Sequence, residues 1–409
     1  MGGAGAEDGD SAAQLQAACL PAAMERALEV AVRGRGSVAP NPVVGAVAVR
    51  DGEIVGEGWH ARYGGPHAER DLIARLTERG GPDACRGADL YVTLEPCAHH
   101  GKTPPCTDAV IEAGFARVFV GCDDPNPETS GQGYARLAAA GIPVLRDVAG
   151  EAARAVVADY LCLRRTGRAL ATAKWAMTAD GRIASVEGDS RWISSEATRE
   201  LTRRERGGQD AILVGRGTVE ADDPLLTART DGTIDPVRVV LDSRFRLPPE
   251  SRLVRTAGET PLVVIGSAGG GEPGPDEEAR RRTLEARGVI TLRVEAGSDR
   301  RPRPSALLTA LGALRIDDPT IGVRGIAHVL VEGGAEVHGS FLADGCIDRA
   351  RIIVAPRIIG GREAPGPIGG TGIPRMADAL SLRDPRWRAV GEDLLLEAAL
   401  GPLGVGESP

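Results

Sequence analysis

One histidine and two cysteines gathered in a short stretch constrain this chain more than any other feature. The segment Thr93 to Cys106 reads TLEPCAHHGKTPPC, and His67-Ala68-Glu69 precedes it by about thirty positions. Two thiolates and one imidazole are three protein ligands that zinc takes when its fourth tetrahedral position stays open for water. This pattern predicts a metal site that does chemistry.

Glu69 follows His67 at a spacing that suits a general acid/base. It lies two residues beyond the histidine, near enough to share the cavity and offset from ligation itself. The order H-x-E and then P-C is the signature of zinc deaminases, in which two residues separate the cysteines. Here eight residues, Ala98 to Pro105, separate Cys97 from Cys106. We expect this loop to fold back so that both thiolates reach one metal, and to border the pocket.

Two other interpretations fit the same residues. Without a metal, the cysteines would serve as buried apolar side chains and His67 as a hydrogen-bonded surface histidine. A closed structural zinc site would need a fourth ligand such as His99 or His100. The joint pattern of histidine, carboxylate and two cysteines, each beside an apolar run, favours the open site.

The length of 409 residues exceeds one ordinary core and predicts two domains. The expected parts are a flexible leader over 1–20, a zinc domain over 21–148, a connector helix over 149–168, a second domain over 169–401 and a tail over 402–409. A net charge of −8 argues against a nucleic-acid binder, which would carry a basic stripe.

Nothing in the sequence predicts export or a membrane partner. No run approaches eighteen consecutive apolar residues, and the N-terminus lacks the basic start and apolar centre of a signal peptide. We therefore expect a cytoplasmic protein. Its seven cysteines are an odd number, which favours reduced thiols and metal ligation over a disulfide framework.

The apolar patterns of the first domain predict a layered α/β fold. Val43–Val49 and Glu53–Trp59 are expected strands, joined into a hairpin at Arg50-Asp51-Gly52. The further expected elements are a helix over Met24–Arg33, a helix from His67, a strand over Asp89–Leu94, a helix over Thr107–Ala113 and a strand over Arg117–Gly121. Cys106 would lie just ahead of a helix, where the dipole favours a thiolate.

Strands and helices alternate in the second domain, which predicts a mostly parallel sheet covered on both faces. The expected strands are Ala169–Met177, Asp210–Gly215, Val237–Leu241, Leu262–Ile265, Ile326–Val331 and Ala350–Val354. After His328–Val331, the glycines of Glu332-Gly333-Gly334-Ala335 would let the backbone at a helix start approach a phosphate. Ser267 to Gly325 is expected to form loops and mobile surface without chemistry.

At the zinc motif the sequence resembles the bifunctional riboflavin-biosynthesis deaminase/reductase family. HAE and EPCAHHGKTPPC carry this resemblance, and the long loop between the cysteines separates the family from cytidine and adenosine deaminases. The resemblance extends from about Met24 to Leu400. It implies an α/β protein with a cytidine-deaminase-like three-layer domain, a dihydrofolate-reductase-like domain, one zinc ion per chain and NADPH.

In the first domain the resemblance implies contacts to a diaminopyrimidinone ribosylamino phosphate. Zinc would be held by His67, Cys97 and Cys106, with Glu69 as the catalytic acid/base. The residues implied to bind the substrate are Asn41, His99, Lys102, Asp124 and Asn126. By their residue types alone, Asn41 and the Asp123–Pro127 segment also suit turns, and Lys102 also suits a solvated position.

In the second domain KWAMTADGRI, GDSRWI and GRGTVEADDPLLTAR carry the resemblance, which implies hydride transfer from NADPH. The residues implied near NADPH are Ala176, Trp192, Thr218, Asp222, Ser243, Gly334, Ala335, Glu336, Val337, His338, Gly339 and Ser340. Those implied near the phosphorylated substrate are Lys174, Ser190, Arg206, Leu226, Arg229 and Glu332. Arginine suits a phosphate through paired charge-assisted hydrogen bonds, and Lys174 and Glu332 are candidates to polarise or anchor the sugar.

The resulting hypothesis is a two-step enzyme that acts as a homo-oligomer on a small phosphorylated pyrimidine. A nucleic-acid base deaminase would share the zinc site but would need a basic, aromatic-lined channel. The negative charge and the aromatic content of 3% disfavour that channel. A zinc-stabilised scaffold without activity would need Glu69 to be dispensable.

Overall fold

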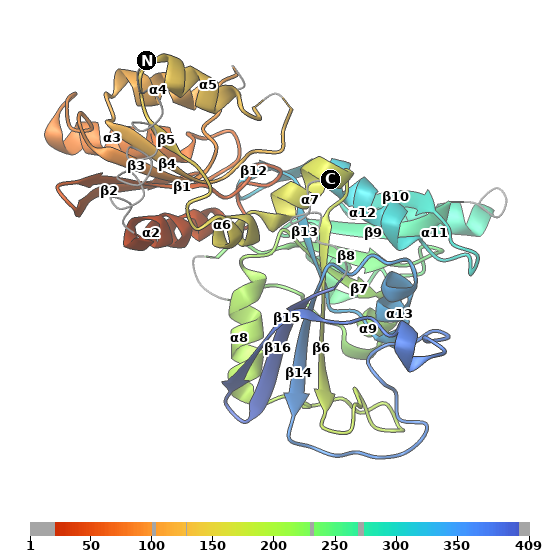
Figure 1. Cartoon of the computed structure of the whole chain (residues 1–409). Helices are drawn as coiled ribbons and strands as arrows, with labels where there is room; N and C mark the ends of the chain where they lie inside the picture. Colours follow the sequence, from red (N-terminus) through yellow and green to blue (C-terminus); the bar gives the residue numbers. More distant parts are fainter. Residues whose placement is uncertain (1–20, 100–103, 128, 230–232, 269–273, 401–409) are drawn as a thin grey trace. The chain divides into compact units, whose positions relative to one another are not determined.

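The computed structural model describes residues 21–99, 104–127, 129–229, 233–268 and 274–400. The chain forms two compact units that divide between Arg165 and Thr166 (Figure 1). Each unit has its own sheet and its own apolar cores. In the described ranges, every helix is too short or too polar to cross a bilayer.

A five-stranded sheet forms the centre of the first unit, in the order β2-β1-β3-β4-β5. Its strands are β1 (Gly45–Arg50), β2 (Glu53–Trp59), β3 (Asp89–Leu94), β4 (Arg117–Cys122) and β5 (Val144–Leu145). β1 pairs antiparallel with β2 and β3, whereas β3, β4 and β5 run parallel. The predicted hairpin is confirmed: Asp51 and Gly52 have φ values of 51° and 85°, as a two-residue turn of this kind requires.

Helices cover both faces of this sheet. They are α2 (Pro21–Ala31) with the 3-10 turn η1 (Val32–Gly34), α3 (Ala68–Gly80), α4 (Cys106–Glu112), α5 (Gln132–Ala139) and α6 (Gly150–Val156). Alternate residues of β1 enter opposite cores, because successive side chains of a strand point to opposite faces. Ala46 and Ala48 pack with α3, α4 and α5, while Val47 and Val49 pack with α2. The three-layer α/β arrangement expected from the sequence is confirmed.

Helix α3 lies against β2 at a glycine. A Cβ atom on Gly58 would fall 2.3 Å from the backbone nitrogen of Leu72 and 2.6 Å from the carbonyl oxygen of Ala68. Any side chain here would therefore push the helix away from the sheet. The missing side chain of Gly58 sets how near the first turns of α3 lie to β2.

Two helices replace the single connector helix that the sequence predicted over 149–168. α6 ends at Val156, and α7 (Ala158–Thr166) begins after Val157. Val157 departs from helical geometry, with φ −102° and ψ 19°, and is fully buried. The prediction of one continuous helix is wrong, because the break lets Val157 enter the core.

A nine-stranded sheet forms the centre of the second unit, in the order β10-β9-β8-β7-β13-β6-β14-β16-β15. Its strands are β6 (Leu170–Thr178), β7 (Ala211–Gly215), β8 (Val237–Leu241), β9 (Leu262–Ala268), β10 (Ile290–Glu295), β13 (His328–Val331), β14 (Arg349–Ala355), β15 (Arg383–Val390) and β16 (Asp393–Ala399). The strands from β10 to β14 pair in parallel. β16 and β15 add an antiparallel edge. The predicted mostly parallel sheet is confirmed.

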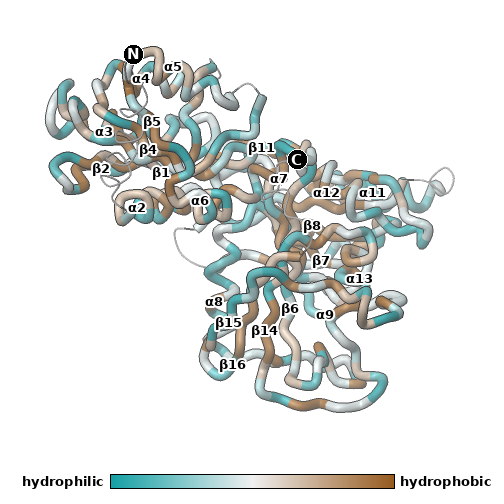
Figure 2. Tube along the Cα trace, in the orientation of Figure 1, coloured by the Kyte–Doolittle hydropathy of each residue, from teal (hydrophilic) through white to brown (hydrophobic). Residues whose placement is uncertain are grey.

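Both faces of this sheet are also covered. The helices are α8 (Glu196–Arg206), α9 (Arg216–Asp222), α10 (Arg252–Arg255), α11 (Pro275–Glu285), α12 (Pro304–Ala313) and α13 (Ala335–Ala343), with a 3-10 turn η2 (Met376–Asp378). Leu213 of β7 packs in one core with Leu307 and Phe341, whereas its neighbour Val214 packs in another with Leu253. Figure 2 shows apolar residues concentrated along the strands of both sheets.

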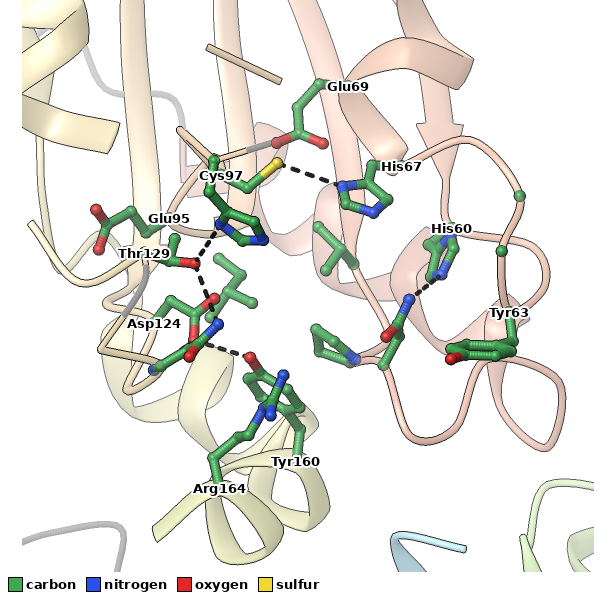
Figure 3. Close-up of a pocket in the computed structure, with 18 residues that line it drawn as sticks. His60, Tyr63, His67, Glu69, Glu95, Cys97, Asp124, Thr129, Tyr160 and Arg164 are labelled. Atoms are coloured by element: carbon green, nitrogen blue, oxygen red, sulfur yellow. Dashed lines mark hydrogen bonds between the residues drawn. The ribbon is translucent and has the colours of Figure 1, made fainter. Parts of the chain in front are cut away.

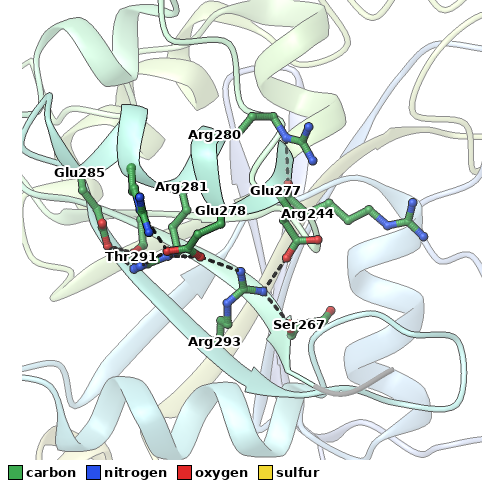
Figure 4. A network of polar contacts seen from close by, with 10 residues as sticks. Arg244, Ser267, Glu277, Glu278, Arg280, Arg281, Glu285, Thr291 and Arg293 are labelled. Atoms are coloured by element: carbon green, nitrogen blue, oxygen red, sulfur yellow. Dashed lines mark hydrogen bonds and ion pairs between the residues drawn. The ribbon is translucent and has the colours of Figure 1, made fainter. Parts of the chain in front are cut away.

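The segment from Ser267 to Gly325 contains regular structure where loops were predicted. It holds α11, β10, α12 and a two-stranded hairpin, β11 (Ile316–Asp318) with β12 (Gly322–Arg324). Leu307 and Leu311 of α12 are fully buried. On α11, Glu277 pairs with Arg293 of β10 across 2.5 Å (Figure 4). The loop prediction is wrong because α11 has few apolar residues, and α12 is a short apolar helix without a clear helical period.

Candidate functional site

Three segments of the first unit bring the expected metal ligands together. His67 immediately precedes α3, Cys97 follows the end of β3 by three residues and Cys106 begins α4. The sequence predicted Cys106 just ahead of this helix, so its position differs by one residue. Two ligands therefore lie at helix starts, where unpaired backbone N–H groups and the dipole favour negative charge.

The two ends of the loop between the cysteines lie close together, as the expected fold-back of the loop requires. The Cys106 N–H group donates to Cys97 Sγ across 3.4 Å. The guanidinium of Arg70, on α3, donates to the carbonyl oxygens of Pro104 and Pro105 across 3.1 and 3.0 Å. Residues 100–103 of this loop, with His100 and Lys102, lie outside the described residues.

The distances between the three donor atoms fit zinc. His67 Nδ1 lies 3.6 Å from Cys97 Sγ (Figure 3). It lies 3.3 Å from Cys106 Sγ, and the three atoms lie within 4.8 Å of one another. Tetrahedral bonds of about 2.3 Å to sulfur and about 2.0 Å to nitrogen separate those atoms by about 3.6 Å. Both the chemistry of the donors and their spacing therefore suit this ion.

His99 does not close the metal site. Among the residues with described positions, the donors close enough to share a metal are His67, Cys97 and Cys106, with no fourth member. The Nδ1 atom of His99 instead lies 3.3 Å from the hydroxyl oxygen of Thr129. A closed site that uses His99 is therefore disfavoured, and the geometry matches three protein ligands with an open position.

The two thiols are electrostatically unequal. Their mutual hydrogen bond lowers the pKa of Cys97 to about 4, and the same contact, together with burial, raises the pKa of Cys106. The pair thus already favours one thiolate before any metal is considered. Metal binding requires deprotonated sulfur, a condition that Cys97 meets near neutral pH.

Glu69 lies in the first turn of α3, and 4% of its surface is exposed. Burial raises the pKa of its carboxyl group, and the neighbouring charge of Cys97 raises it further. Figure 3 shows this carboxylate beside Cys97 and His67. A raised pKa suits a carboxyl group that must accept a proton and release it near neutral pH.

A cavity of about 220 Å³ lies beside the metal ligands. Asn41, His99, Asp124 and Asn126, four of the five residues expected to bind the deaminase substrate, line it together with Glu69. The fifth, Lys102, lies outside the described residues. Sequence positions that are far apart thus meet around one hollow, as in a small-molecule site.

Hydrogen bonds hold the wall formed after β4. Asp124 Oδ1 accepts from the Tyr160 hydroxyl and from the Asn126 N–H group, each across 2.9 Å. The buried Glu95 carboxylate accepts from the N–H groups of Gly131 and Gly133 across 3.2 and 3.1 Å. These bonds fix the loop that carries Asp124 and Asn126 against the end of the sheet.

Sequence reasoning did not single out several other residues that line the cavity, among them His60, Tyr63, Thr129, Tyr160 and Arg164. Tyr160 and Arg164 belong to α7, which the sequence assigned only to a connector. His60 follows β2, and burial lowers the pKa of its ring to about 4, so the ring is neutral near pH 7. No sequence motif marks these five as residues of a binding site.

The second unit contains a separate cleft of about 700 Å³. It is lined by eight of the twelve residues expected near NADPH, and by one expected near the substrate, Ser190. The eight are Thr218, Asp222, Ser243, Gly334, Ala335, Glu336, Val337 and Ser340. The glycines after β13 and the start of α13 thus border a cleft large enough for a dinucleotide.

The other four expected cofactor residues do not line this cleft. His338 is buried, and its ring nitrogens lie 3.1 Å from the carbonyl oxygens of Pro367 and Val331. Trp192 is exposed and carries the guanidinium of Arg199 over its ring at 4.7 Å. The remaining two are Ala176, which lies on β6, and Gly339, which lies in α13.

A buried charge cluster lies at the end of β13. Arg206 donates to both carboxylate oxygens of Glu332, across 2.7 and 3.2 Å. Burial acts to raise the pKa of Glu332, but the charges of Arg206 and Lys174 outweigh burial and lower this pKa to about 2. Burial lowers the pKa of Lys174, which the charge of Glu332 opposes. This cluster unites three residues that the sequence placed near the reductase substrate.

The other two expected substrate residues differ in accessibility. Leu226 is 2% exposed and packs in the core, so its backbone is the part that can meet a ligand. Burial lowers the pKa of Arg229, and the nearby charges of Arg206, Arg252 and Arg203 lower it further. The positive charges gathered around Arg229 make a favourable environment for a polyanion.

Two family models match the chain. The one described as the cytidine and deoxycytidylate deaminase zinc-binding region covers residues 19–122, and the one described as the RibD C-terminal domain covers residues 170–396. The first range contains the whole zinc-ligand group, and the second contains most of the nine-stranded sheet.

Known relatives match this chain across both units. The chain is 38% identical to riboflavin biosynthesis protein RibD of Actinobacillus pleuropneumoniae over 93% of this chain and 95% of the relative. It is 40% identical to RibD of Bacillus amyloliquefaciens over 92% and 95%. Among solved structures, the deaminase/reductase of Thermotoga maritima has a TM-score of 0.75 at 33% identity, covering 93% and 98%. A RibD structure from Acinetobacter baumannii has a TM-score of 0.76 at 32% identity, with the same coverage.

Proposed function

This chain belongs to the RibD family of bifunctional riboflavin-biosynthesis deaminase/reductases. We propose that its first unit deaminates 2,5-diamino-6-ribosylamino-4(3H)-pyrimidinone 5′-phosphate. We propose that its second unit then reduces the ribosyl group of the product to ribityl with NADPH. One observation carries the first assignment: His67, Cys97 and Cys106 converge beside a buried Glu69 at the edge of a cavity.

In the deamination, a zinc ion held by His67, Cys97 and Cys106 would supply a Lewis acid that lowers the pKa of bound water. The Glu69 carboxylate accepts a proton and delivers it to the departing amino nitrogen, which leaves as ammonia. The ring carbon exchanges its amino group for the oxygen of one water molecule. Asn41, His99, Lys102, Asp124 and Asn126 hold the pyrimidine and its substituents.

In the reduction, the cofactor carries the hydride and the protein supplies position and charge. Arg206 and Arg229 bind the substrate phosphate, and Lys174 and Glu332 anchor the sugar. The preference for NADPH over NADH is supported by arginines that line the cleft, among them Arg244 and Arg246. Neither of these two has an ion-pair partner in the described part of the chain, so both are available to a 2′-phosphate.

The test of this function is to follow ammonia and cofactor oxidation separately. Purified protein and the phosphorylated diaminopyrimidinone should release one ammonia per substrate without any nicotinamide. Addition of NADPH should then oxidise one cofactor per deaminated product, and NADH should react at least about tenfold more slowly, as expected for one lost charged contact. Ammonia release that requires NADPH, or equal rates with both cofactors, would contradict the assignment.

A homo-oligomer is further supported by an exposed apolar surface at the sheet edge that β15 forms. Trp387 is 58% exposed, and Leu394 of the neighbouring strand β16 is also exposed. An unpaired edge strand with apolar neighbours tends to be covered in a stable protein. Light scattering should give at least twice the chain mass of 42.5 kDa, and Trp387→Glu should lower it. A monomeric wild-type protein at micromolar concentration would contradict this.

A further inference from the structure

His60 lies beside the zinc ligands without being one of them. It follows β2, is 2% exposed and meets the ring of His67 edge to face, with 5.3 Å between the ring centroids. Its Nδ1 atom lies 2.8 Å from the carbonyl oxygen of Pro66, and its Nε2 atom lies 3.2 Å from Nδ2 of Asn41 (Figure 3). Both ring nitrogens are therefore engaged within the protein.

These partners determine which nitrogen of His60 carries the proton. A carbonyl oxygen can only accept a hydrogen bond, so Nδ1 is protonated and donates to Pro66. Nε2 of the neutral ring then holds a lone pair and accepts from the amide nitrogen of Asn41. With its nitrogen turned to His60, Asn41 keeps its oxygen, Oδ1, on the other side of the planar amide. Asn41 Oδ1 has no hydrogen-bond partner among the described residues, and Asn41 lines the cavity.

We propose that His60 is a positioning residue of the deaminase site, which holds Asn41 so that its carbonyl oxygen faces the ligand and accepts from an N–H group of the pyrimidine. This proposal rests on the deamination proposed above. A fixed Asn41 oxygen favours a heterocycle that presents an amino or ring N–H group to it. A heterocycle that presents an acceptor atom there would leave both atoms unpaired, so the site would discriminate strongly against it. His60 acts through Asn41 and does not touch the reacting atoms.

Two amide substitutions of His60 separate its two hydrogen bonds. Gln reaches the position of Nε2 and can offer an oxygen to Asn41, whereas Asn reaches the position of Nδ1 and keeps only the bond to Pro66. His60→Asn should raise the KM of deamination about tenfold, as loss of one oriented hydrogen bond predicts, and leave kcat within about twofold. His60→Gln should restore most of this loss. Zinc content and the reduction of separately supplied deaminated product should be unchanged in both variants.

A double-mutant cycle with Asn41→Ala tests whether His60 acts through Asn41. Once Asn41 is truncated, His60→Asn should raise KM no further, because the two changes remove the same interaction. Additive effects, equal defects in the Gln and Asn variants, or loss of zinc would overturn the positioning role. Wild-type protein that releases no ammonia would instead overturn the deaminase assignment itself, so the two failures are distinguishable.

Discussion

Glu69→Gln should slow ammonia release by about 10²- to 10⁴-fold, because the amide cannot carry the proton that a general acid/base transfers. The change preserves the size of the side chain, and Glu69 is not among the metal-ligand donors, so zinc should remain bound at one ion per chain. The measurement is kcat/KM for ammonia release, with zinc determined on the same sample. NADPH oxidation with deaminated product supplied separately should be unaffected.

The matched control lies on the same helix. Glu78 of α3 is exposed, so Glu78→Gln should leave both activities near the wild-type values. Full ammonia release by the Glu69 variant would reject the catalytic role and favour a zinc-stabilised scaffold. Loss of zinc together with activity would mean that Glu69 supports the metal instead of moving a proton.

Glu332→Gln should abolish most reductase activity and destabilise the second unit. The carboxylate is the ion-pair partner of Arg206 and also favours the charged form of Lys174, and the neutral amide removes both of these contributions. Removal of one partner from a buried ion pair costs about 3 to 5 kcal/mol. Calorimetry should show a lower unfolding temperature for the second unit, and ammonia release by the first unit should persist.

The pH dependence gives a second readout for the same residue. The pKa of Glu332 is lowered from 4.5 to about 2, so its contribution to stability is present above about pH 4.5 and is lost as pH falls towards 2. The amide variant should lack this dependence. Asp378→Asn, which removes an exposed ion pair with Arg375, should leave the unfolding temperature near the wild-type value. Equal effects of the two substitutions would contradict the role given to Glu332.

The zinc centre was predictable because its determinants are local. His67 and Glu69 are separated by one residue, and each cysteine adjoins a recognisable strand or helix, so residue type and spacing were sufficient. Tyr160 and Arg164 were not predictable as cavity residues, because they belong to α7, which begins after a break at Val157 where the sequence predicted one continuous helix. Whether a helix breaks depends on tertiary burial, which a helical sequence pattern does not express.

The errors in the second unit have a related cause. Leu307 and Leu311 of α12 fill the core, but a short helix among glycines, prolines and arginines gives a weak periodic pattern. The charge cluster of Arg206 and Glu332 joins residues that lie 126 positions apart, and neither has a local motif. The family resemblance assigned Arg206 and Glu332 to one substrate site, which composition and periodicity alone could not do.

The close approach of α3 to β2 at Gly58 has an implication for how the deaminase tolerates sequence change. The zinc ligand His67 and the proton carrier Glu69 both lie at the start of α3, whereas the two cysteine ligands belong to other segments. A methyl group at Gly58 would shift His67 and Glu69 together and leave Cys97 and Cys106 in place. The alignment of the zinc ligands with Glu69 thus depends on the backbone contact at Gly58, a residue without a side chain.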